Sequence, residues 1–389
     1  MMYDVVIVGG GAIGSAIAYF LMLEPGFAGS VAVVERDPTY RTASTALSAG
    51  GIRQQYSTEV NIRIGQFGIG FMRGISTTLM VDDEAPTINL REQGYLFLAS
   101  PEGLADLQAN HALQRRLGVA VELLETDALL RRFPWLNGTG LAAGSIGRDE
   151  GWLDPYSLLQ AYRRKARSLG AVYLHDEVVG LRRTGQRVSD VRLASGEHLS
   201  CGIVVNAAGP RSRAVAEMAG LALPVEARKR CVFVVDCKTP IPSCPLVIDA
   251  SGVWFRPEGA SFICGVSPPE ERDAEDFGLE VDHDIFPDEL WPVLAERVPA
   301  FEALKVVGSW AGHYEYNVFD HNGILGAQPE IPNLIFATGF SGHGLQQSPA
   351  IGRGISELVA FGEYRTLDLR PLSIQRILDN RKLLERNIV

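Results

Sequence analysis

The chain has 389 residues, 46% of them hydrophobic and 21% charged, which is enough apolar material for more than one core and suggests two domains. Its 36 basic and 46 acidic side chains give a formal net charge of −10 without any basic run, which argues against nucleic-acid binding. The longest clearly apolar stretch, residues 12–23, is too short to cross a bilayer, and no basic segment precedes the first apolar run, so we expect neither a membrane span nor a secretory signal.

Five cysteines lie within residues 201–264, in an odd number and without a C-x-x-C pair. Zinc and iron–sulfur sites need closer ligand spacing, so we expect no metal site. Reduced structural cysteines are typical of the cytosol, and we therefore predict a cytoplasmic protein.

The N-terminal segment has the pattern of a βαβ unit. An apolar strand over residues 4–8 is followed by a glycine-rich turn, an apolar helix that reaches Leu23 and a second strand over 31–34. A fold of this kind places a ligand at the turn between the first strand and the helix.

The turn reads G-x-G-x-x-G through Gly9, Gly11 and Gly14. These glycines allow a tight turn, a close approach of pyrophosphate to the backbone and close helix–strand packing. Glu35 ends the second strand, where a carboxylate can accept the ribose hydroxyls. The pattern predicts a dinucleotide site, although the unit alone does not distinguish FAD from NAD.

Residues 36–57 are rich in Ser, Thr, Ala and Gly and have little periodicity, which indicates a long loop held against a ligand. A second α/β stretch begins near Asp154, with a helix over 155–169, a strand over 171–174 and two short strands that meet at residues 195–196. It ends in a strand over 203–206 and the turn at Gly209, which either lies beside the dinucleotide or is an ordinary turn.

Residues 221–312 change to short β-rich segments broken by Pro and Gly, with one amphipathic helix over 287–297, and they predict a separate, largely antiparallel domain. The chain then returns to an α/β pattern, with a strand over 334–337 and a helix over 345–361. Between them, Gly339, Gly342 and Gly344 bring backbone N–H groups and a helix N-terminus to one point, which suits the negative charge of a reduced flavin. His343 in this turn is also explained as a plain turn residue.

Three stretches carry a resemblance to a known family: L-S-A-G-G-I-R-Q-Q-Y from Leu47, S-W-A-G-H-Y-E-Y-N-V-F-D from Ser309, and T-G-F-S-G-H-G-L-Q-Q from Thr338. With the N-terminal unit, they resemble the D-amino-acid-oxidase-like superfamily of FAD-dependent oxidoreductases, and within it the branch of FAD-dependent oxidoreductase domain-containing protein 1. The resemblance runs from Tyr3 to about Val359 and is loose across 101–141.

The resemblance implies an α/β plus α+β fold, in which a Rossmann-type FAD-binding domain of discontinuous segments (1–85, 143–220 and 322–389) carries an antiparallel β-rich substrate domain (86–142 and 221–321). The FAD-binding positions that we predict are Gly9, Gly11, Ala12, Ile13, Gly14, Glu35, Arg36, Ser44, Thr45, Ser48, Ala49, Gly50, Gly51, Val178, Ala207, Ala208, Gly209, Gly339, Gly342, His343, Gly344, Leu345 and Gln346.

Two departures from the family qualify this picture. Relatives that attach FAD covalently through a cysteine carry it near Gly312 or His313, and here no cysteine stands there and no histidine occurs before Asn110, so we expect non-covalent FAD. Sarcosine-oxidase-like members also carry lysines after the Gly-His-Gly turn and in the strand over 262–266, and this chain has neither. Their absence weighs against a true oxidase.

Arg53 resembles a carboxylate-binding arginine of sarcosine-oxidase-like enzymes, and Arg256 is a second candidate, because an arginine fork binds a carboxylate bidentately. Either arginine could instead pair with an internal acid. His313 and Tyr314 follow a predicted strand and either line the site or belong to the core.

The prediction is a dehydrogenase or oxidase that removes a hydride equivalent next to the nitrogen of an amine or amino acid, with oxygen, a quinone or an electron-transfer protein as acceptor. One alternative is an FAD-containing assembly or interaction factor without turnover, because the branch that this chain resembles includes a respiratory-complex assembly protein. Another is a flavin hydroxylase, which would need NAD(P)H.

Overall fold

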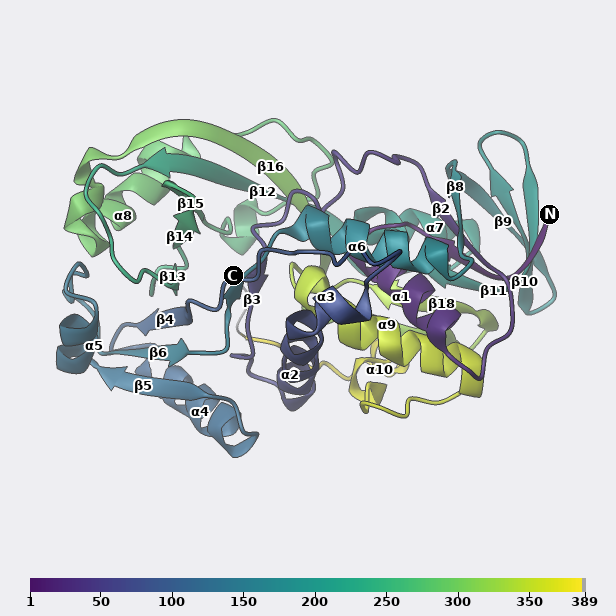
Figure 1. Ribbon diagram of the computed structural model, residues 1–389, viewed down its shortest axis with the longest axis horizontal. Coiled ribbons are helices and arrows are strands. Elements are labelled where there is room, and N and C mark those ends of the chain that lie inside the picture. The colour runs from purple at the N-terminus through teal and green to yellow at the C-terminus, as the bar shows by residue number, and fades with distance from the viewer. Residues whose placement is uncertain (387–389) are drawn as a thin grey trace.

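The computed structural model describes residues 1–386. Two lobes lie side by side, each built around one large sheet (Figure 1). Within the described residues, no helix combines the length and apolarity that a bilayer span requires, and no group of His, Cys, Asp and Glu side chains is arranged to hold a metal ion.

The first lobe contains a mainly parallel sheet with the order β17-β18-β11-β1-β2-β8. Its parallel strands are β1 (Met2–Val8), β2 (Val31–Glu35), β8 (Val172–His175), β11 (His198–Asn206) and β18 (Ile331–Thr338). The antiparallel strand β17 (Ile324–Gln328) borders β18, and the hairpin of β9 (Val178–Thr184) and β10 (Arg187–Leu193) joins β11. The strands β1, β2 and β18 have near-continuous apolar stretches because these stretches are buried on both faces.

Three helices cover one face of this sheet: α1 (Ala12–Leu23), α6 (Pro155–Ser168) and α9 (Gly344–Phe361), with α2 (Glu59–Arg73) packed on α9 (Figure 1). The helix α7 (Ser212–Met218) covers the other face. Short helices α3 (Ile75–Thr78) and α10 (Gln375–Leu378) complete the lobe. The two cores that result hold the carboxyl ends of β1, β11 and β18 at one edge, where a doubly wound fold binds its ligand.

The second lobe contains an eight-stranded sheet with the order β16-β12-β15-β14-β13-β4-β6-β5. Its strands are β4 (Tyr95–Ala99), β5 (Val121–Glu125), β6 (Ala143–Gly147), β12 (Val225–Asp236), β13 (Leu246–Ile248), β14 (Trp254–Glu258), β15 (Ser261–Gly265) and β16 (Lys305–Asn317). All neighbours are antiparallel except β13 and β4. The helices of this lobe are α4 (Leu104–Arg116), α5 (Thr126–Arg132) and α8 (Trp291–Arg297).

The mixed fold with a Rossmann-type parallel sheet and a separate antiparallel sheet confirms the predicted fold class. One strand differs from the expected segments: β6 falls in the range 143–220 assigned to the FAD domain, yet it pairs with β4 and β5 of the other sheet. The chain crosses between lobes after β6, near β7 (Gly151–Trp152), which pairs with β3 (Gly51–Ile52). The remaining domain boundaries stay a proposal.

Candidate active site

In the glycine turn after β1, other backbone segments pack directly against the glycines. Gly9 has φ +99°, and a Cβ added there would lie 2.4 Å from the carbonyl oxygen of Ala207. A Cβ on Gly14 would lie 1.9 Å from the carbonyl oxygen of Gly9. Both positions therefore exclude any side chain, as the G-x-G-x-x-G pattern requires.

The N-terminus of α1 opens into a groove beside this turn. No side chain caps it at Gly11, and no acidic residue stands in its first turn. Arg36 and Arg211 line the same groove, and burial together with repulsion from Arg36 lowers the pKa of the Arg211 guanidinium. The N–H of Ala12 donates to Thr45 Oγ1 at 3.0 Å. The N-terminal end of the helix dipole and two cations are nevertheless features that suit a pyrophosphate.

Glu35 lies where the sequence placed it, at the end of β2 and on the groove wall. Its Oε2 atom accepts a hydrogen bond from Gly10 N at 2.8 Å, and its Oε1 atom accepts one from Asp37 N at 2.9 Å. These bonds fix the carboxylate in the groove. Each oxygen keeps lone-pair capacity for a ribose hydroxyl.

The groove encloses about 1090 Å³ of atom-free space, part of it open to solvent. The predicted FAD positions that line it are Gly9, Gly11, Ala12, Ile13, Glu35, Arg36, Ser44, Thr45, Ala207, Ala208 and Gly209. A second cavity of about 1200 Å³ continues from it towards the antiparallel sheet, because both are lined by Ala12, Ile13, Ser44, Thr45, His313 and Glu315. Together they offer a continuous site for an extended dinucleotide and a small substrate.

The second cavity lies between the lobes. Of the predicted positions it adds Ser48, Ala49, Gly51, Arg53, Tyr314, Gly342, His343, Gly344, Leu345 and Gln346. Its wall from the antiparallel sheet includes the apolar side chains of Val232, Leu246 and Trp254. The helix α9 starts at this cavity, with no side-chain cap and no acid in its first turn. A helix N-terminus here suits the anionic edge of a reduced flavin.

Five predicted site residues do not line either cavity. Gly14 packs against Gly9, Gly50 packs against Leu153, and Val178 pairs with Leu193 within the β9–β10 hairpin. Gly339 donates its N–H to Glu315 at 3.2 Å. The fifth is Arg256.

Arg256 is used inside the protein. Its Nε and Nη2 atoms donate to the carbonyl oxygen of Ala49 at 2.9 and 2.7 Å, and its Nη1 atom pairs with Glu258. Trp310 Nε1 donates to the carbonyl oxygen of Leu47 at 2.9 Å. Arg256 therefore holds the 47–50 loop against the antiparallel sheet, rather than facing the cavity.

Arg53 lies in the cavity and is only 4% exposed. Its Nη2 atom donates to His343 Nε2 at 2.7 Å, and its guanidinium lies over Tyr56, Tyr95 and Phe97, with centroid distances of 4.7, 5.7 and 5.3 Å. Because arginine only donates, His343 accepts at Nε2 and carries its proton on Nδ1. Burial, with Arg53 beside it, lowers the pKa of His343 well below its usual value, so the ring is neutral.

His313 and Tyr314 stand on β16 and line the cavity from the opposite side. His313 Nε2 donates to the carbonyl oxygen of Gly278 at 3.0 Å, and burial lowers the pKa of the ring. Burial also raises the pKa of Tyr314. Both side chains are therefore uncharged near neutral pH.

Two charged residues of the cavity were missed by the sequence analysis. Arg230 on β12 forms a bidentate pair with Asp273, at 2.7 Å for each bond, and lies over the Tyr314 ring. Glu315 on β16 reaches both cavities. Arg230 belongs to no motif, and Glu315 lies within the family-like stretch from Ser309 but was given no role. The signal that could have found them is the alternation of β12 and β16, which places charged residues on a half-buried face.

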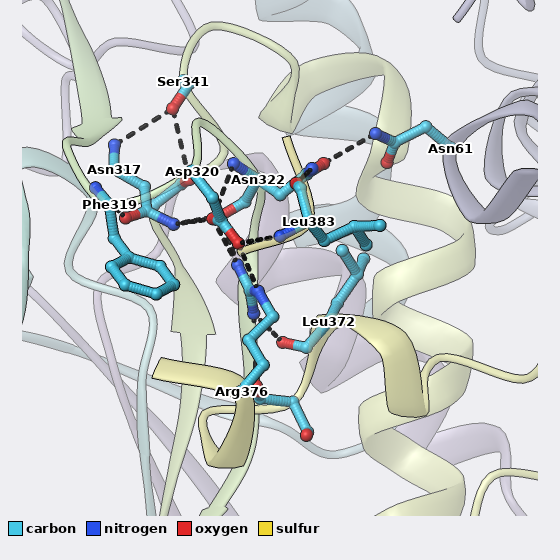
Figure 2. Close-up of polar contacts among 11 residues, drawn as sticks. Asn61, Asn317, Phe319, Asp320, Asn322, Ser341, Leu372, Arg376 and Leu383 are labelled. Carbon is cyan, nitrogen blue, oxygen red and sulfur yellow. Dashed lines mark hydrogen bonds and ion pairs between the residues drawn. The ribbon is translucent and has the colours of Figure 1, made fainter. Parts of the chain in front are cut away.

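A buried polar network holds the end of β16 and the α9 turn together (Figure 2). Asp320, fully buried, accepts from Arg376 Nε at 2.7 Å and Nη2 at 2.9 Å. Asn317 donates its N–H to Ser341 Oγ at 3.0 Å and its Nδ2 atom to Asp320 at 2.8 Å. Arg376 of the C-terminal segment is thus connected through Asp320 and Asn317 to Ser341 and helps to fix the 339–344 turn.

Comparison with known proteins identifies the family. Residues 4–358 match the family model described as DAO: FAD dependent oxidoreductase. FAD-dependent oxidoreductase domain-containing protein 1 of Xenopus laevis is 46% identical over 99% of this chain and 85% of that protein. Sarcosine oxidase subunit beta of Rhizobium meliloti (strain 1021) is 27% identical over 92% of this chain and 85% of its own length.

Among solved structures, L-proline dehydrogenase from P. horikoshii superposes with a TM-score of 0.87 at 25% identity, covering 97% of this chain and 98% of that one. The glycine turn, the Arg36–Arg211 groove and the α9 N-terminus fit the FAD that this family requires. The chain belongs to the DAO family of FAD-dependent oxidoreductases.

Proposed function

We propose that the protein oxidises the C–N bond of an amino acid or N-substituted amino acid of the sarcosine, dimethylglycine or glycine type. The proposal rests mainly on the position of Arg53. This buried arginine lines the same cavity at which helix α9 begins. A guanidinium fork in this position selects a small carboxylate. The names of the sarcosine oxidase subunit and the proline dehydrogenase support the same substrate class.

Bound FAD supplies a two-electron acceptor for the hydride of the carbon next to nitrogen. Arg53 holds the substrate carboxylate, and neutral His343 keeps the guanidinium oriented through its Nε2 atom. Val232, Leu246 and Trp254 pack against the substrate body and exclude water. No base is required beyond solvent if the amine binds deprotonated, and the imine product then hydrolyses in water.

We further propose that FAD is held non-covalently and that oxygen is a poor acceptor. No lysine is among the residues that line the two cavities. The relatives' attachment position near His313 carries no cysteine, although Cys231 of the neighbouring strand does line the cavity. The physiological acceptor and the predicted cytoplasmic location stay predictions.

Turnover with an artificial electron acceptor tests the substrate class when matched compounds are compared. Sarcosine, dimethylglycine, glycine and proline are assayed beside their 2-hydroxy acids and their decarboxylated amines. We expect turnover only where amine and carboxylate are both present, with an amine or ammonia as product. Turnover of the decarboxylated amines at equal kcat/KM would remove the role of the carboxylate fork, and no turnover with any compound would favour an FAD-containing assembly factor.

A further inference from the structure

Glu315 is a half-buried acid that the proposed reaction does not use. It lies on β16 and lines both the dinucleotide groove and the cavity. Its Oε2 atom accepts from Thr338 Oγ1 at 2.8 Å and from Gly339 N at 3.2 Å. Its Oε1 atom lies 3.2 Å from the point where a Cβ on Gly344 would stand, at the start of α9. One oxygen is therefore anchored, while the other faces the turn that we assign to the flavin.

The anchored oxygen belongs to a chain of hydroxyl groups. Thr338 Oγ1 lies 2.6 Å from Ser212 Oγ, and Ser212 Oγ donates to the carbonyl oxygen of Gly209 at 2.7 Å. Each hydroxyl has one hydrogen to donate. Since Ser212 uses its hydrogen on Gly209, Thr338 has one hydrogen for two acceptors, Ser212 and Glu315.

Both protonation states of Glu315 fit this chain. When the carboxyl is ionised, Thr338 donates to it. When it is protonated, the carboxyl O–H donates to Thr338, and Thr338 turns its own hydrogen to Ser212. The change needs only hydroxyl rotations: in the ionised state Ser212 no longer accepts from Thr338 but keeps its own bond to Gly209, so Glu315, Thr338 and Ser212 each keep at least one hydrogen-bond partner in both states.

The other charged or titratable residues that line the two cavities are Glu35, Arg36, Arg53, Tyr95, Arg211, Arg230, Cys231, His313, Tyr314 and His343. They come from β2, the 36–57 loop, β4, the 209–211 turn, β12, β16 and the α9 turn. Burial raises the pKa of Tyr95 to about 12, so it is uncharged near neutral pH. Burial lowers the pKa of both histidines and raises that of Tyr314, so these three are uncharged near neutral pH, and the arginines are permanently charged. Burial raises the pKa of Glu315 to about 7, against the hydrogen bonds from Thr338 and Gly339, which lower it.

We propose that Glu315 takes up one proton when the bound flavin is reduced. Two electrons and one proton reach the flavin as a hydride and leave it with one negative charge at the α9 N-terminus. One further proton, from the oxidised amine or from solvent, binds the Glu315 carboxylate, so the net charge of the site stays constant. The carboxylate and the reduced flavin would otherwise repel each other beside the same helix N-terminus.

The pH dependence of the flavin potential tests this without any substrate. When the flavin takes up two electrons and one proton, the equilibrium constant of its reduction falls tenfold per pH unit, and the reduction potential falls by about 30 mV per pH unit. Uptake of a second proton doubles this slope of potential against pH. We expect the doubled slope in the wild-type protein from about pH 7 upwards, where the oxidised form has lost the Glu315 proton and the reduced form keeps it. Photoreduction of the bound flavin in weak buffer, with a pH-indicator dye present, measures the same extra proton as it is taken up from solvent.

Glu315→Gln should show the single slope throughout and a higher potential than wild type at alkaline pH, because no negative charge remains beside the flavin. Thr338→Val removes a donor to the ionised carboxyl, which raises the pKa of Glu315, so the doubled slope should begin at a higher pH. If Glu315→Gln does not bind FAD, the shift in Thr338→Val tests the proposal instead. Glu150→Gln is the matched control, since burial raises the pKa of Glu150 to about 7 but its carboxyl bonds to Gln54 and Gln55 away from the cavity.

Three results would overturn the proposal. The first is a reduction potential of the wild-type protein that keeps the single slope from pH 6 to 9, so that the equilibrium constant changes only tenfold per pH unit. The second is a doubled slope that survives in Glu315→Gln, even if FAD affinity has fallen, because Glu315 would then only bind the cofactor. The third is loss of the doubled slope in Glu150→Gln, which would place the proton elsewhere.

Discussion

Replacing Arg53 tests the substrate site at one side chain. Arg53 is 4% exposed, its Nη2 atom donates to His343 Nε2 at 2.7 Å, and its guanidinium lies near three aromatic rings. Arg53→Lys keeps the positive charge but has no planar fork, so one charge-assisted hydrogen bond to the substrate carboxylate is lost. That bond is worth about 1.5 to 3 kcal/mol, which weakens substrate binding about tenfold to a hundredfold. Arg53→Ala also loses the charge and should bind more weakly still.

Anaerobic stopped-flow reduction of the bound flavin gives the substrate Kd separately from the rate of the chemical step. FAD content should not change, because Arg53 is proposed to contact substrate. Arg256→Lys is the matched control: Arg256 is equally buried but bonds to Ala49 and Glu258, so its variant should lose stability and keep the substrate Kd of the wild type. Unchanged substrate affinity in FAD-loaded Arg53→Ala would refute the assignment. Loss of FAD instead would move Arg53 to the cofactor site.

Four further predictions concern the cofactor, the acceptor and the fold. Glu35→Arg should abolish FAD loading, measured by the flavin-to-protein absorbance ratio, because it removes the ribose acceptor and adds a third cation to the groove; normal loading would exclude Glu35 as the ribose ligand. Acid precipitation should release yellow flavin into the supernatant, whereas flavin that stays on the protein in a denaturing gel would reveal a covalent bond and direct attention to Cys231. Hydrogen peroxide should form more slowly in air than an artificial acceptor is reduced, since no lysine lines the cavities, and equal rates would identify an oxidase. Arg376→Leu should lower the free energy of unfolding by about 3 to 5 kcal/mol, seen in denaturant titrations, because it leaves Asp320 buried without its cation; a loss below about 1 kcal/mol would mean that water reaches Asp320.

The elements with strong local patterns could be predicted from the sequence. The βαβ unit, Glu35 and the α9 turn follow from glycine spacing and hydrophobic periodicity, which depend on near neighbours along the chain. Helix α2 was not predicted, because its three glycines disfavour a helix. Two of them have a packing role: an added Cβ on Gly65 would lie 2.7 Å from Arg53 O, and one on Gly68 would lie 2.8 Å from Gln346 O.

The partners of charged side chains could not be read from the sequence. Arg53 was the first candidate for a carboxylate-binding arginine and Arg256 the second, and only the fold shows that Arg256 bonds to Ala49 and Glu258. Glu315 lies in the family-like stretch from Ser309, but its surroundings arise from Thr338 and Gly339, which are 23 and 24 positions away in the sequence. The strand β6 was not predicted, and its pairing with β4 and β5 is likewise a contact between segments that lie apart in the sequence.

The most direct test of the account is anaerobic mixing of the FAD-loaded protein with the amino-acid panel, followed by the yellow absorbance of the oxidised flavin. We predict that at least one amino or N-substituted amino acid bleaches the flavin completely and stoichiometrically, and that the corresponding 2-hydroxy acid does not. Oxidised flavin that persists with every amino acid, while dithionite still reduces it, would contradict the proposal that this cavity oxidises a C–N bond.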